Sequence, residues 1–177
     1  MPQNGGLTLL LGGARSGKST AAVEMASRWD GPVVVIATAE ARDEEMRARI
    51  ERHRRARPEG WTIIEEPIDL EGTLEEVGSD ACVVIDCLTL WVSNLMERGL
   101  SADGIEERGR KAAAIAAGRS SPTIVVTNEV GWGIVPTNEL ARRFRDVLGE
   151  VNKAWAEASE SAWLMVAGKA LPLVDRP

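Results

Sequence analysis

Short apolar runs alternate with longer amphipathic segments along the chain. The runs are rich in valine, isoleucine and leucine without polar alternation, which is typical of strands buried on both faces of a sheet. We predict strands at residues 7–11, 32–37, 61–65, 81–86, 123–127 and 162–167, with a short hairpin partner at 171–174. The segments between them have helical spacing. We predict helices at residues 18–29, 42–57, 69–77, 88–98, 105–117 and 138–159.

Strands that alternate with helices predict an α/β fold, in which helices cover both sides of one sheet. The chain has 177 residues, a length that favours one domain spanning residues 1–177 with one core. No repeat or low-complexity tract interrupts the pattern. We therefore expect all functional groups to lie on a single sheet.

The overall charge narrows the class of ligand. The formal net charge is -6, so a non-specific nucleic-acid binder is not expected. An anionic ligand would have to be held by a local positive site rather than by the field of the whole protein. Hydrophobic residues make up 44% of the chain and charged residues 27%, an ordinary globular composition.

The cysteines and the chain start bear on location. Cys82 and Cys87 flank one apolar run, too close along a strand to bridge comfortably, and we interpret them as buried thiols in a reducing compartment. Residues 1–6 lack the basic and apolar regions of a signal peptide, and no apolar stretch is long enough to cross a bilayer. These features predict a cytoplasmic protein without a membrane span.

A phosphate-binding motif follows the first predicted strand. Residues 12–19 read G-G-A-R-S-G-K-S, which fits the P-loop pattern between a strand and a helix. Backbone N–H groups of such a loop converge on phosphates, and the helix dipole favours the same negative charge. Lys18 is expected to reach the β- and γ-phosphates and Ser19 to coordinate Mg²⁺. The alternative is a glycine-rich turn without a ligand; the context favours binding of a purine nucleoside triphosphate.

A P-loop site also needs an acid at a strand end to hold Mg²⁺. Asp86 ends the apolar run at residues 82–86 and is our candidate. The alternative is that Asp86 caps the helix predicted from residue 88. Glu129, just after the strand at residues 123–127, is a second candidate for the same rim.

His53, the only histidine, lies in a strongly basic predicted helix. Helical spacing places Arg49 and Arg57 on the same face as His53. Neighbouring cations favour a neutral imidazole, which could attack phosphorus while the arginines stabilise the developing charge. The alternative is a solvated basic helix that carries one histidine by chance, and the residues alone favour that interpretation.

Taken together, these segments resemble the bifunctional adenosylcobinamide kinase/adenosylcobinamide-phosphate guanylyltransferase family of cobalamin biosynthesis. The resemblance covers nearly the whole chain. It rests on G-G-A-R-S-G-K-S at residues 12–19, E-M-x-x-R-I-x-x-H-R-x-x-R-P at 45–58, V-I-D-C-L-T-x-W-V-x-N-L at 84–95 and T-N-E-V-G-W-G-I-V-P at 127–136. The P-loop alone is not specific, whereas the His53 segment together with residues 128–136 is.

The resemblance implies two reactions at one enzyme. ATP or GTP first phosphorylates the aminopropanol hydroxyl of adenosylcobinamide. GMP is then transferred from GTP to that phosphate, which gives adenosylcobinamide-GDP and pyrophosphate. The transfer passes through a covalent GMP–histidine, and His53 matches that histidine. The resemblance thus assigns catalytic roles to His53 and Lys18 and reverses the interpretation of His53 from the residues alone.

The resemblance also implies a nucleotide site, a metal site and an assembly. The implied nucleotide contacts are Gly12, Gly13, Ala14, Arg15, Ser16, Gly17, Lys18, Ser19, Ala37, Thr38, Ala39, Arg54, Arg55, Ala56, Arg57, Glu65 and Asp86. Mg²⁺ would be held by Ser19 and Asp86. The implied fold is a P-loop NTPase-like three-layer sandwich with a mostly parallel sheet and an antiparallel edge strand, assembled as a homotrimer.

The segment at residues 128–136 has its own physical interpretation. Gly131 and Gly133 permit a tight loop that would carry the apolar side chains of Trp132 and Ile134. A large corrinoid needs an apolar rim, so this loop is a candidate surface for the acceptor. Packing of Trp132 against another subunit is an equally weighted alternative.

Two other functions remain as alternatives. A regulatory P-loop ATPase or GTPase would hydrolyse nucleotide to switch a protein partner. A simple small-molecule kinase would leave His53 inert. Only the guanylyltransferase forms a covalent adduct with GMP, so that adduct distinguishes the three.

Overall fold

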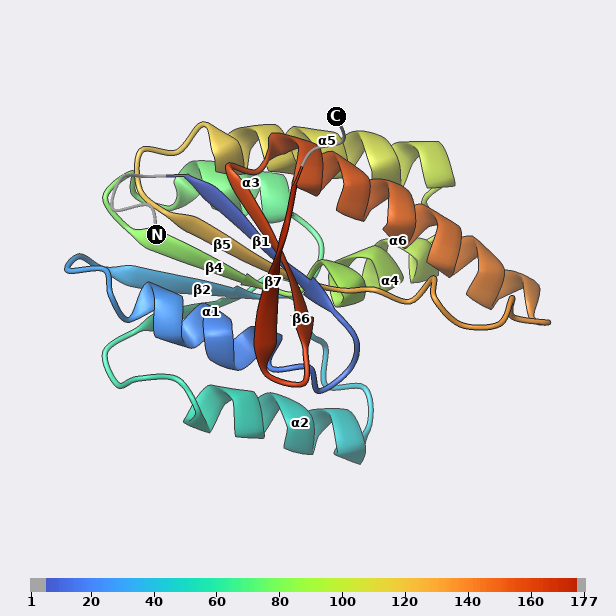
Figure 1. Cartoon of the computed structure of the whole chain (residues 1–177), viewed down its shortest axis with the longest axis horizontal. Coiled ribbons are helices and arrows are strands. Elements are labelled where there is room, and N and C mark those ends of the chain that lie inside the picture. Colours follow the sequence, from blue (N-terminus) through green and yellow to red (C-terminus); the bar gives the residue numbers. More distant parts are fainter. Residues whose placement is uncertain (1–5, 175–177) are drawn as a thin grey trace.

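One sheet runs through the computed structural model, which describes residues 6–174 (Figure 1). Within these residues its strands are β1 (Leu7–Gly12), β2 (Val33–Ala37), β3 (Thr62–Glu65), β4 (Cys82–Asp86), β5 (Thr123–Asn128), β6 (Ser161–Val166) and β7 (Lys169–Leu173). Their order across the sheet is β3-β2-β4-β5-β1-β6-β7. All pairs from β3 to β6 are parallel, and β7 pairs with β6 in the antiparallel direction. The predicted antiparallel edge strand is confirmed.

Six helices connect the strands in the described residues. They are α1 (Lys18–Ala26), α2 (Glu44–Arg55), α3 (Leu70–Glu76), α4 (Leu88–Glu97), α5 (Ala102–Ala117) and α6 (Glu139–Ala158). Each predicted helix and strand is present, with ends that differ by a few residues. Among the described residues five helices are shorter than predicted, whereas α5 begins upstream of its first predicted residue because Ser101 caps it there.

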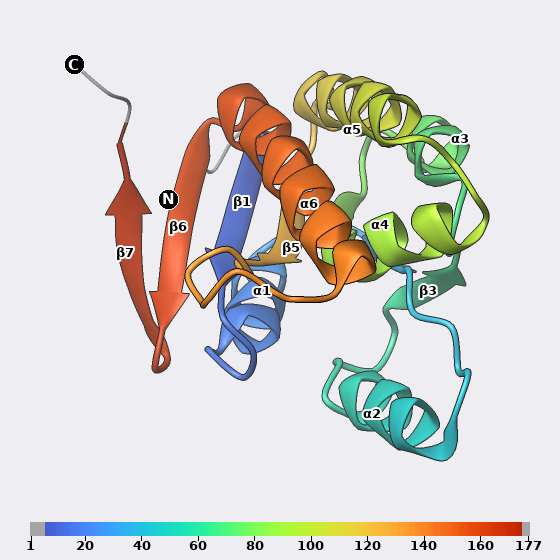
Figure 2. The ribbon, with the colours of Figure 1, turned by 90° about the vertical axis from the view of Figure 1, so that its right-hand side faces the viewer.

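Side chains on the two faces of the sheet join different cores. Leu7 and Leu9 of β1 belong to a cluster with α3, α4, α5 and α6, whereas Leu10 belongs to a second cluster with α1. Alternate residues of a strand point to opposite faces, so both faces of β1 are covered. Figure 2 shows α6 and α1 with β1 between them. The predicted three-layer α/β sandwich is confirmed.

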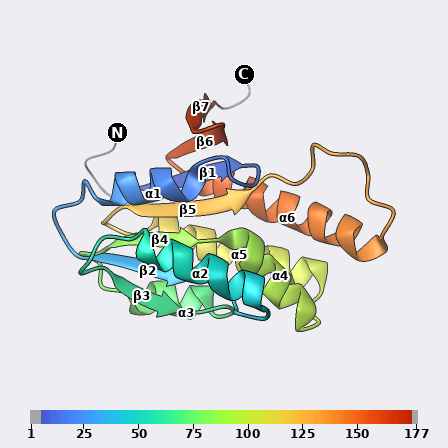
Figure 3. The same cartoon turned by 90° about the horizontal axis from the view of Figure 1, so that it is seen from below.

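Helix α2 differs from the other helices because none of its residues is buried. It lies on the side of the sheet that α1 covers, away from α3, α4, α5 and α6, as the views from the side and from below show (Figures 2 and 3). Its high charge explains why it does not pack into a core.

Several tryptophans and the two cysteines lie in the interior of the fold. Trp91 and Trp155 are fully buried, and Trp163 is partly buried against the α1 side. Both cysteines are free, and burial raises the pKa of the Cys82 and Cys87 thiols to about 11. No helix within residues 6–174 combines the length and apolar character that crossing a membrane requires. The prediction about a signal peptide falls largely on residues 1–5, which lie outside the described residues.

Candidate functional site

The P-loop joins β1 to α1 through an unusual backbone. Arg15 and Gly17 both have positive φ values, 56° and 98°. A side chain at Gly17 would be strained there, and its Cβ would lie 3.1 Å from the Cα of Gly168 in the β6–β7 turn. The same turn is tied to the loop by a hydrogen bond from Gly168 N to Ser16 O, 2.9 Å long. The antiparallel hairpin therefore supports the P-loop from the side.

Lys18 is held at the base of this loop. Its side chain is only 6% exposed, and Nζ donates to Gly12 O at 2.8 Å and to Gly13 O at 2.7 Å. Burial lowers the pKa of Lys18 from its ordinary value. The ammonium group is thus kept close to the backbone that is expected to bind phosphate. Its burial costs desolvation free energy, which a bound anion would offset.

Asp86 lies at the carboxyl end of β4, where it contacts the basic segment. Its Oδ2 is 3.2 Å from a terminal guanidinium nitrogen of Arg57 and 3.4 Å from Nδ1 of His53. Burial by itself would raise the pKa of Asp86, but hydrogen bonding and charge attraction from His53 and Arg57 hold it below its ordinary value. Asp86 is therefore an ionised carboxylate at neutral pH.

The interpretation of Asp86 as a helix cap is wrong. Cys87 is the N-cap residue of α4, and no side chain caps that helix. The strand that carries Asp86 is also not the direct neighbour of the P-loop strand, because β5 lies between β4 and β1. Parallel strands nevertheless bring all three carboxyl ends to one edge of the sheet.

His53 is positioned by α2, which begins when the Asp43 side chain accepts a hydrogen bond of 2.7 Å from Met46 N. The helix ends at Arg55, so Arg57 is not on its face as the spacing predicted. Arg57 instead follows the helix end and turns inward, where its side chain is 9% exposed beside Asp86. Arg57 and His53 both contact Asp86, but the segment after the helix, rather than the helix itself, positions Arg57.

One cavity of about 590 Å³ brings most of the predicted residues together, and we name it the P-loop cavity. The predicted residues that line it are Ala14, Arg15, Ser16, Gly17, Lys18, Ser19, Ala37, Ala39, His53, Arg54, Arg57, Glu65 and Asp86. Its lining also holds five arginines and one lysine against three carboxylates. In a protein of net charge -6, an anionic ligand needs a local positive site, and this net positive cavity provides one.

Five other predicted contacts do not line this cavity, namely Gly12, Gly13, Thr38, Arg55 and Ala56. Thr38 is fully buried, and its hydroxyl accepts from Cys87 N and donates to Cys87 O, at 2.9 and 2.7 Å. It therefore braces the turn after Asp86. Arg55 faces away and pairs with Glu51 at 2.8 Å. Their nucleotide contacts stay predictions.

The structure adds lining residues that the sequence reasoning did not assign to the site. On α2 these are Glu45, Met46, Ile50 and Arg52, and Arg49, which was predicted to lie beside His53, lines the cavity with them. Ile50, Met46 and Glu45 lie three, seven and eight residues before His53, so helical spacing counted from His53 could have found them, whereas Arg52 is the direct neighbour of His53. Asn128, at the end of β5, also lines the cavity and gave no such signal.

Glu129 does not lie on the P-loop cavity, so its prediction as a rim acid is wrong. Its backbone N–H donates to Gly12 O at 3.1 Å, but its carboxylate turns away and accepts from Gly131 N at 2.5 Å. The Glu129 side chain lines a separate cavity between α5, α6 and the loop after β5.

Comparison with known proteins decides the family. The family model described as "Cobinamide kinase / cobinamide phosphate guanyltransferase" matches residues 8–173. The chain belongs to this cobinamide kinase/guanyltransferase family. Among curated relatives, the bifunctional adenosylcobalamin biosynthesis protein CobP of Pseudomonas aeruginosa is 42% identical and covers 96% of this chain and 98% of its own. The corresponding protein CobU of Escherichia coli is 39% identical, covering 92% and 96%. The predicted family is confirmed, and with it the class of enzyme, a transferase.

Solved structures extend the fold beyond this kinase/guanyltransferase family. A protein from Pyrococcus horikoshii OT3 matches with a TM-score of 0.58 at 8% identity, over 97% of this chain and 87% of its own. The RadB recombinase matches with a TM-score of 0.52 at 18% identity, over 91% and 74%. At these identities the likeness concerns the fold alone, and it supports the predicted P-loop NTPase-like architecture.

Proposed function

We propose that this protein phosphorylates adenosylcobinamide with ATP or GTP and then transfers GMP from GTP to adenosylcobinamide phosphate. The observation that carries the proposal is the shared cavity of His53 and the P-loop. A nucleophilic imidazole and a phosphate-binding loop in one positive cavity suit nucleotidyl transfer, whereas a simple kinase or a regulatory NTPase has no use for the imidazole. His53 lines this cavity together with Lys18 and Ser19.

In the kinase step, the hydroxyl of the aminopropanol arm attacks the γ-phosphorus in line, loses its proton, and the nucleoside diphosphate leaves. Lys18 and the P-loop N–H groups stabilise the phosphate charge, so positioning and electrostatics supply most of the rate. The arginines of α2 face the same cavity and add to that positive field.

In the transfer step, His53 attacks the α-phosphorus of GTP, and the bond to pyrophosphate breaks. An oxygen of adenosylcobinamide phosphate then attacks the same phosphorus, the P–N bond breaks, and adenosylcobinamide-GDP leaves with His53 restored. The contact of Nδ1 with Asp86 suggests which nitrogen reacts. A proton on Nδ1 that is donated to the carboxylate leaves the Nε2 lone pair for the attack.

Mg²⁺ belongs to the proposal through Ser19 and Asp86. Both residues line the P-loop cavity, and a hydroxyl with an ionised carboxylate forms the hard oxygen donor set that this ion prefers. Bound there with the nucleotide, the ion would neutralise phosphate charge. We also retain as proposals the homotrimer and the cytoplasmic location.

Replacing His53 tests the covalent step. The His53→Ala protein, incubated with α-labelled GTP and adenosylcobinamide, is expected to form no labelled adduct, because the nucleophile is absent. It should still phosphorylate adenosylcobinamide with ATP, since Lys18 and the P-loop remain. The label retained on denatured protein and the product masses are the measurements.

Arg47→Ala is the matched control, because Arg47 lies on the same helix, is exposed and lies outside the lining of the cavity. It should keep the adduct. An adduct on the His53→Ala protein would refute the assignment, and hydrolysis without any transfer in the native protein would favour the regulatory NTPase.

Replacing Asp86 tests the metal site. The loss of an outer-shell partner of a metal site typically costs about 10–100-fold in metal affinity, and a direct ligand should matter at least as much. We therefore expect Asp86→Asn, saturated with nucleotide, to need at least about tenfold more Mn²⁺ for half-saturation, measured by electron paramagnetic resonance. Glu45→Gln, which removes another carboxylate of the same cavity, should leave the Mn²⁺ affinity unchanged. Equal affinities in native and Asp86→Asn proteins would remove Asp86 from the metal site.

A further inference from the structure

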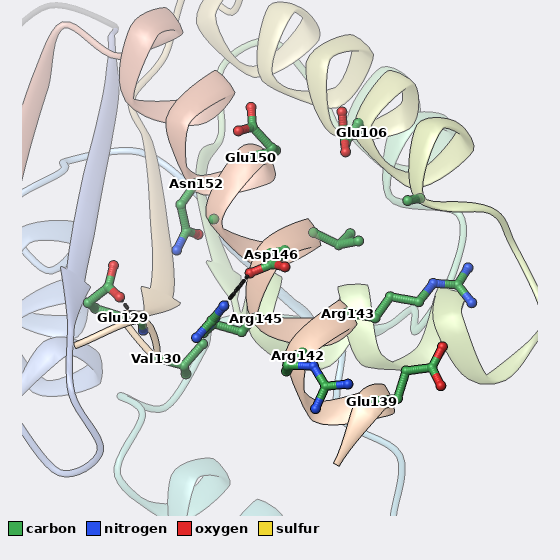
Figure 4. Close-up of a pocket in the computed structure, with 14 residues that line it drawn as sticks. Glu106, Glu129, Val130, Glu139, Arg142, Arg143, Arg145, Asp146, Glu150 and Asn152 are labelled. Carbon is green, nitrogen blue, oxygen red and sulfur yellow. Dashed lines mark hydrogen bonds and ion pairs between the residues drawn. The ribbon is translucent and has the colours of Figure 1, made fainter. Parts of the chain in front are cut away.

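A second cavity, of about 720 Å³, lies between α5, the start of the β5–α6 connection and α6. We name it the α6 groove. Figure 4 shows it running from Glu129, at the end of β5, along α6 to Glu139. The reactions proposed above use only the P-loop cavity, so they assign no role to this groove. Its volume is in the range of small-molecule sites.

The groove adjoins the P-loop through consecutive residues. Asn128 lines the P-loop cavity and Glu129 lines the α6 groove. Glu129 N donates to Gly12 O, and Asn152 of α6 donates through Nδ2 to Asn128 O at 3.0 Å. Only the end of β5 therefore separates the two cavities. A ligand in the groove would begin close to the phosphate-binding loop.

The charges of the two cavities are opposite. The α6 groove is lined by five carboxylates and three guanidinium groups, so it is net negative where the P-loop cavity is net positive. Three of the carboxylates form ion pairs, Asp146 with Arg145, Glu106 with Arg110 and Glu150 with Lys153. The other two arginines are held by backbone carbonyls, since Arg142 donates to Pro136 O and Thr137 O and Arg143 donates to Leu100 O. Among residues 6–174, the Glu129 and Glu139 carboxylates of this lining have no ion-pair partner, and Glu129 accepts only from Gly131 N. Such a lining repels a nucleotide and attracts a cation.

The largest exposed apolar side chains stand on the loop that leads from this groove into α6. Trp132 is 75% exposed and Ile134 is 98% exposed, with Val130, Val135 and Leu140 also exposed. Arg142 fixes the far end of that loop through its two carbonyl contacts. A fixed apolar loop beside an acidic groove fits a ligand that is broad, apolar on its faces and positively charged.

We propose that the α6 groove and the loop at residues 130–135 bind the corrinoid acceptor. This inference rests on the proposed function, which supplies a broad macrocycle with a cationic cobalt centre and a rim of amides. The carboxylates would accept from amide N–H groups and offset the metal charge, and Trp132 would cover part of one face of the ring. The aminopropanol arm would then pass the end of β5 toward the P-loop.

A charge reversal inside and outside the groove tests the inference. Glu150 lines the groove, whereas Glu157 lies further along the same helix, exposed and outside the groove lining. We expect Glu150→Lys and Trp132→Ala each to raise the Kd for adenosylcobinamide about tenfold, measured by equilibrium dialysis of the coloured corrinoid. Glu157→Lys should leave the Kd unchanged. Labelling of His53 by α-labelled GTP should be the same in all three variants, because that step needs no acceptor.

An unchanged Kd in both Glu150→Lys and Trp132→Ala would overturn the inference about the groove. The proposed function would still stand if the native protein formed the labelled adduct and turned over its substrates. If Trp132→Ala dissociated an oligomer in analytical ultracentrifugation without changing the Kd, the loop would be an interface between copies, which also overturns it. Native protein that neither binds the corrinoid nor forms the adduct would instead refute the proposed function itself.

Discussion

The Lys18→Ala protein is expected to lose both reactions together. The kcat/KM for phosphorylation of adenosylcobinamide and the rate of His53 labelling should each fall by about 10²–10³-fold, the usual effect of removing one donor that stabilises transition-state charge. Both reactions need a triphosphate held by the same loop, and the two carbonyl contacts of Nζ keep this ammonium at its base. Affinity for GTP should fall as well.

Lys111→Ala is the matched control, because Lys111 is exposed on α5 and its loss removes the same charge. Its rates should equal those of the native protein. Thermal unfolding separates catalysis from folding: since the Lys18 ammonium is buried and desolvated, its removal should not lower the Tm. Unchanged GTP affinity in the Lys18→Ala protein would show that the P-loop does not hold the nucleotide, and the proposed mechanism would fail with it.

Local sequence features account for the parts of this site that were predicted well. The P-loop is one contiguous segment whose glycines and lysine act through backbone geometry, so its motif and its context define it. The strands of the sheet are apolar on both faces, and the pattern of valine and isoleucine follows directly from that burial. The edge hairpin was also predicted from two short apolar runs, although Ala167 lies in its turn with Gly168 rather than in the strand, and β7 begins at Lys169.

Contacts between distant segments were harder to predict. The pair of Asp86 with Arg57 depends on where α2 ends, and a spacing rule that continued the helix through Arg57 placed the guanidinium on the wrong backbone. The nucleotide contacts predicted at residues 54–57 formed a continuous range. In the structure Arg54 and Arg57 line the cavity, whereas Arg55 points away from it and pairs with Glu51. His53 itself could be assigned only through the family motif, because a basic helix by itself is ordinary.

The α6 groove could not be predicted from sequence at all. Its walls come from α5, α6 and the end of β5, and its charges are spaced like those of any exposed amphipathic helix. Only the packing of α5 against α6 brings Glu106 opposite Glu150 and makes a shared surface (Figure 4). Glu129 illustrates the difficulty, because one backbone turn after β5 moves its carboxylate from the predicted rim to the neighbouring cavity.

The Trp91→Ala protein is expected to be far less stable while keeping the chemistry of the cavity. Trp91 lies on α4, the helix that follows Asp86, and it is 0% exposed in the core under the sheet. Truncating a buried tryptophan typically costs about 3–5 kcal/mol, through lost burial and the cavity that remains. The free energy of unfolding from urea denaturation, fitted with an unchanged m-value, is the measurement.

Two further variants test whether burial, rather than the indole hydrogen bond, accounts for the stability lost in the Trp91→Ala protein. Trp91 Nε1 donates to Ile68 O at 2.9 Å, but Arg108 donates to the same oxygen at 2.8 Å, so Trp91→Phe leaves that oxygen satisfied. Trp91→Phe should therefore lose clearly less stability than Trp91→Ala. Trp132→Ala, which truncates an exposed tryptophan, should stay within about 0.5 kcal/mol of the native protein. Equal losses for Trp91→Ala and Trp132→Ala would mean that α4 does not anchor the end of β4 through its core, and that the position of Asp86 is set by its contacts with His53 and Arg57 alone.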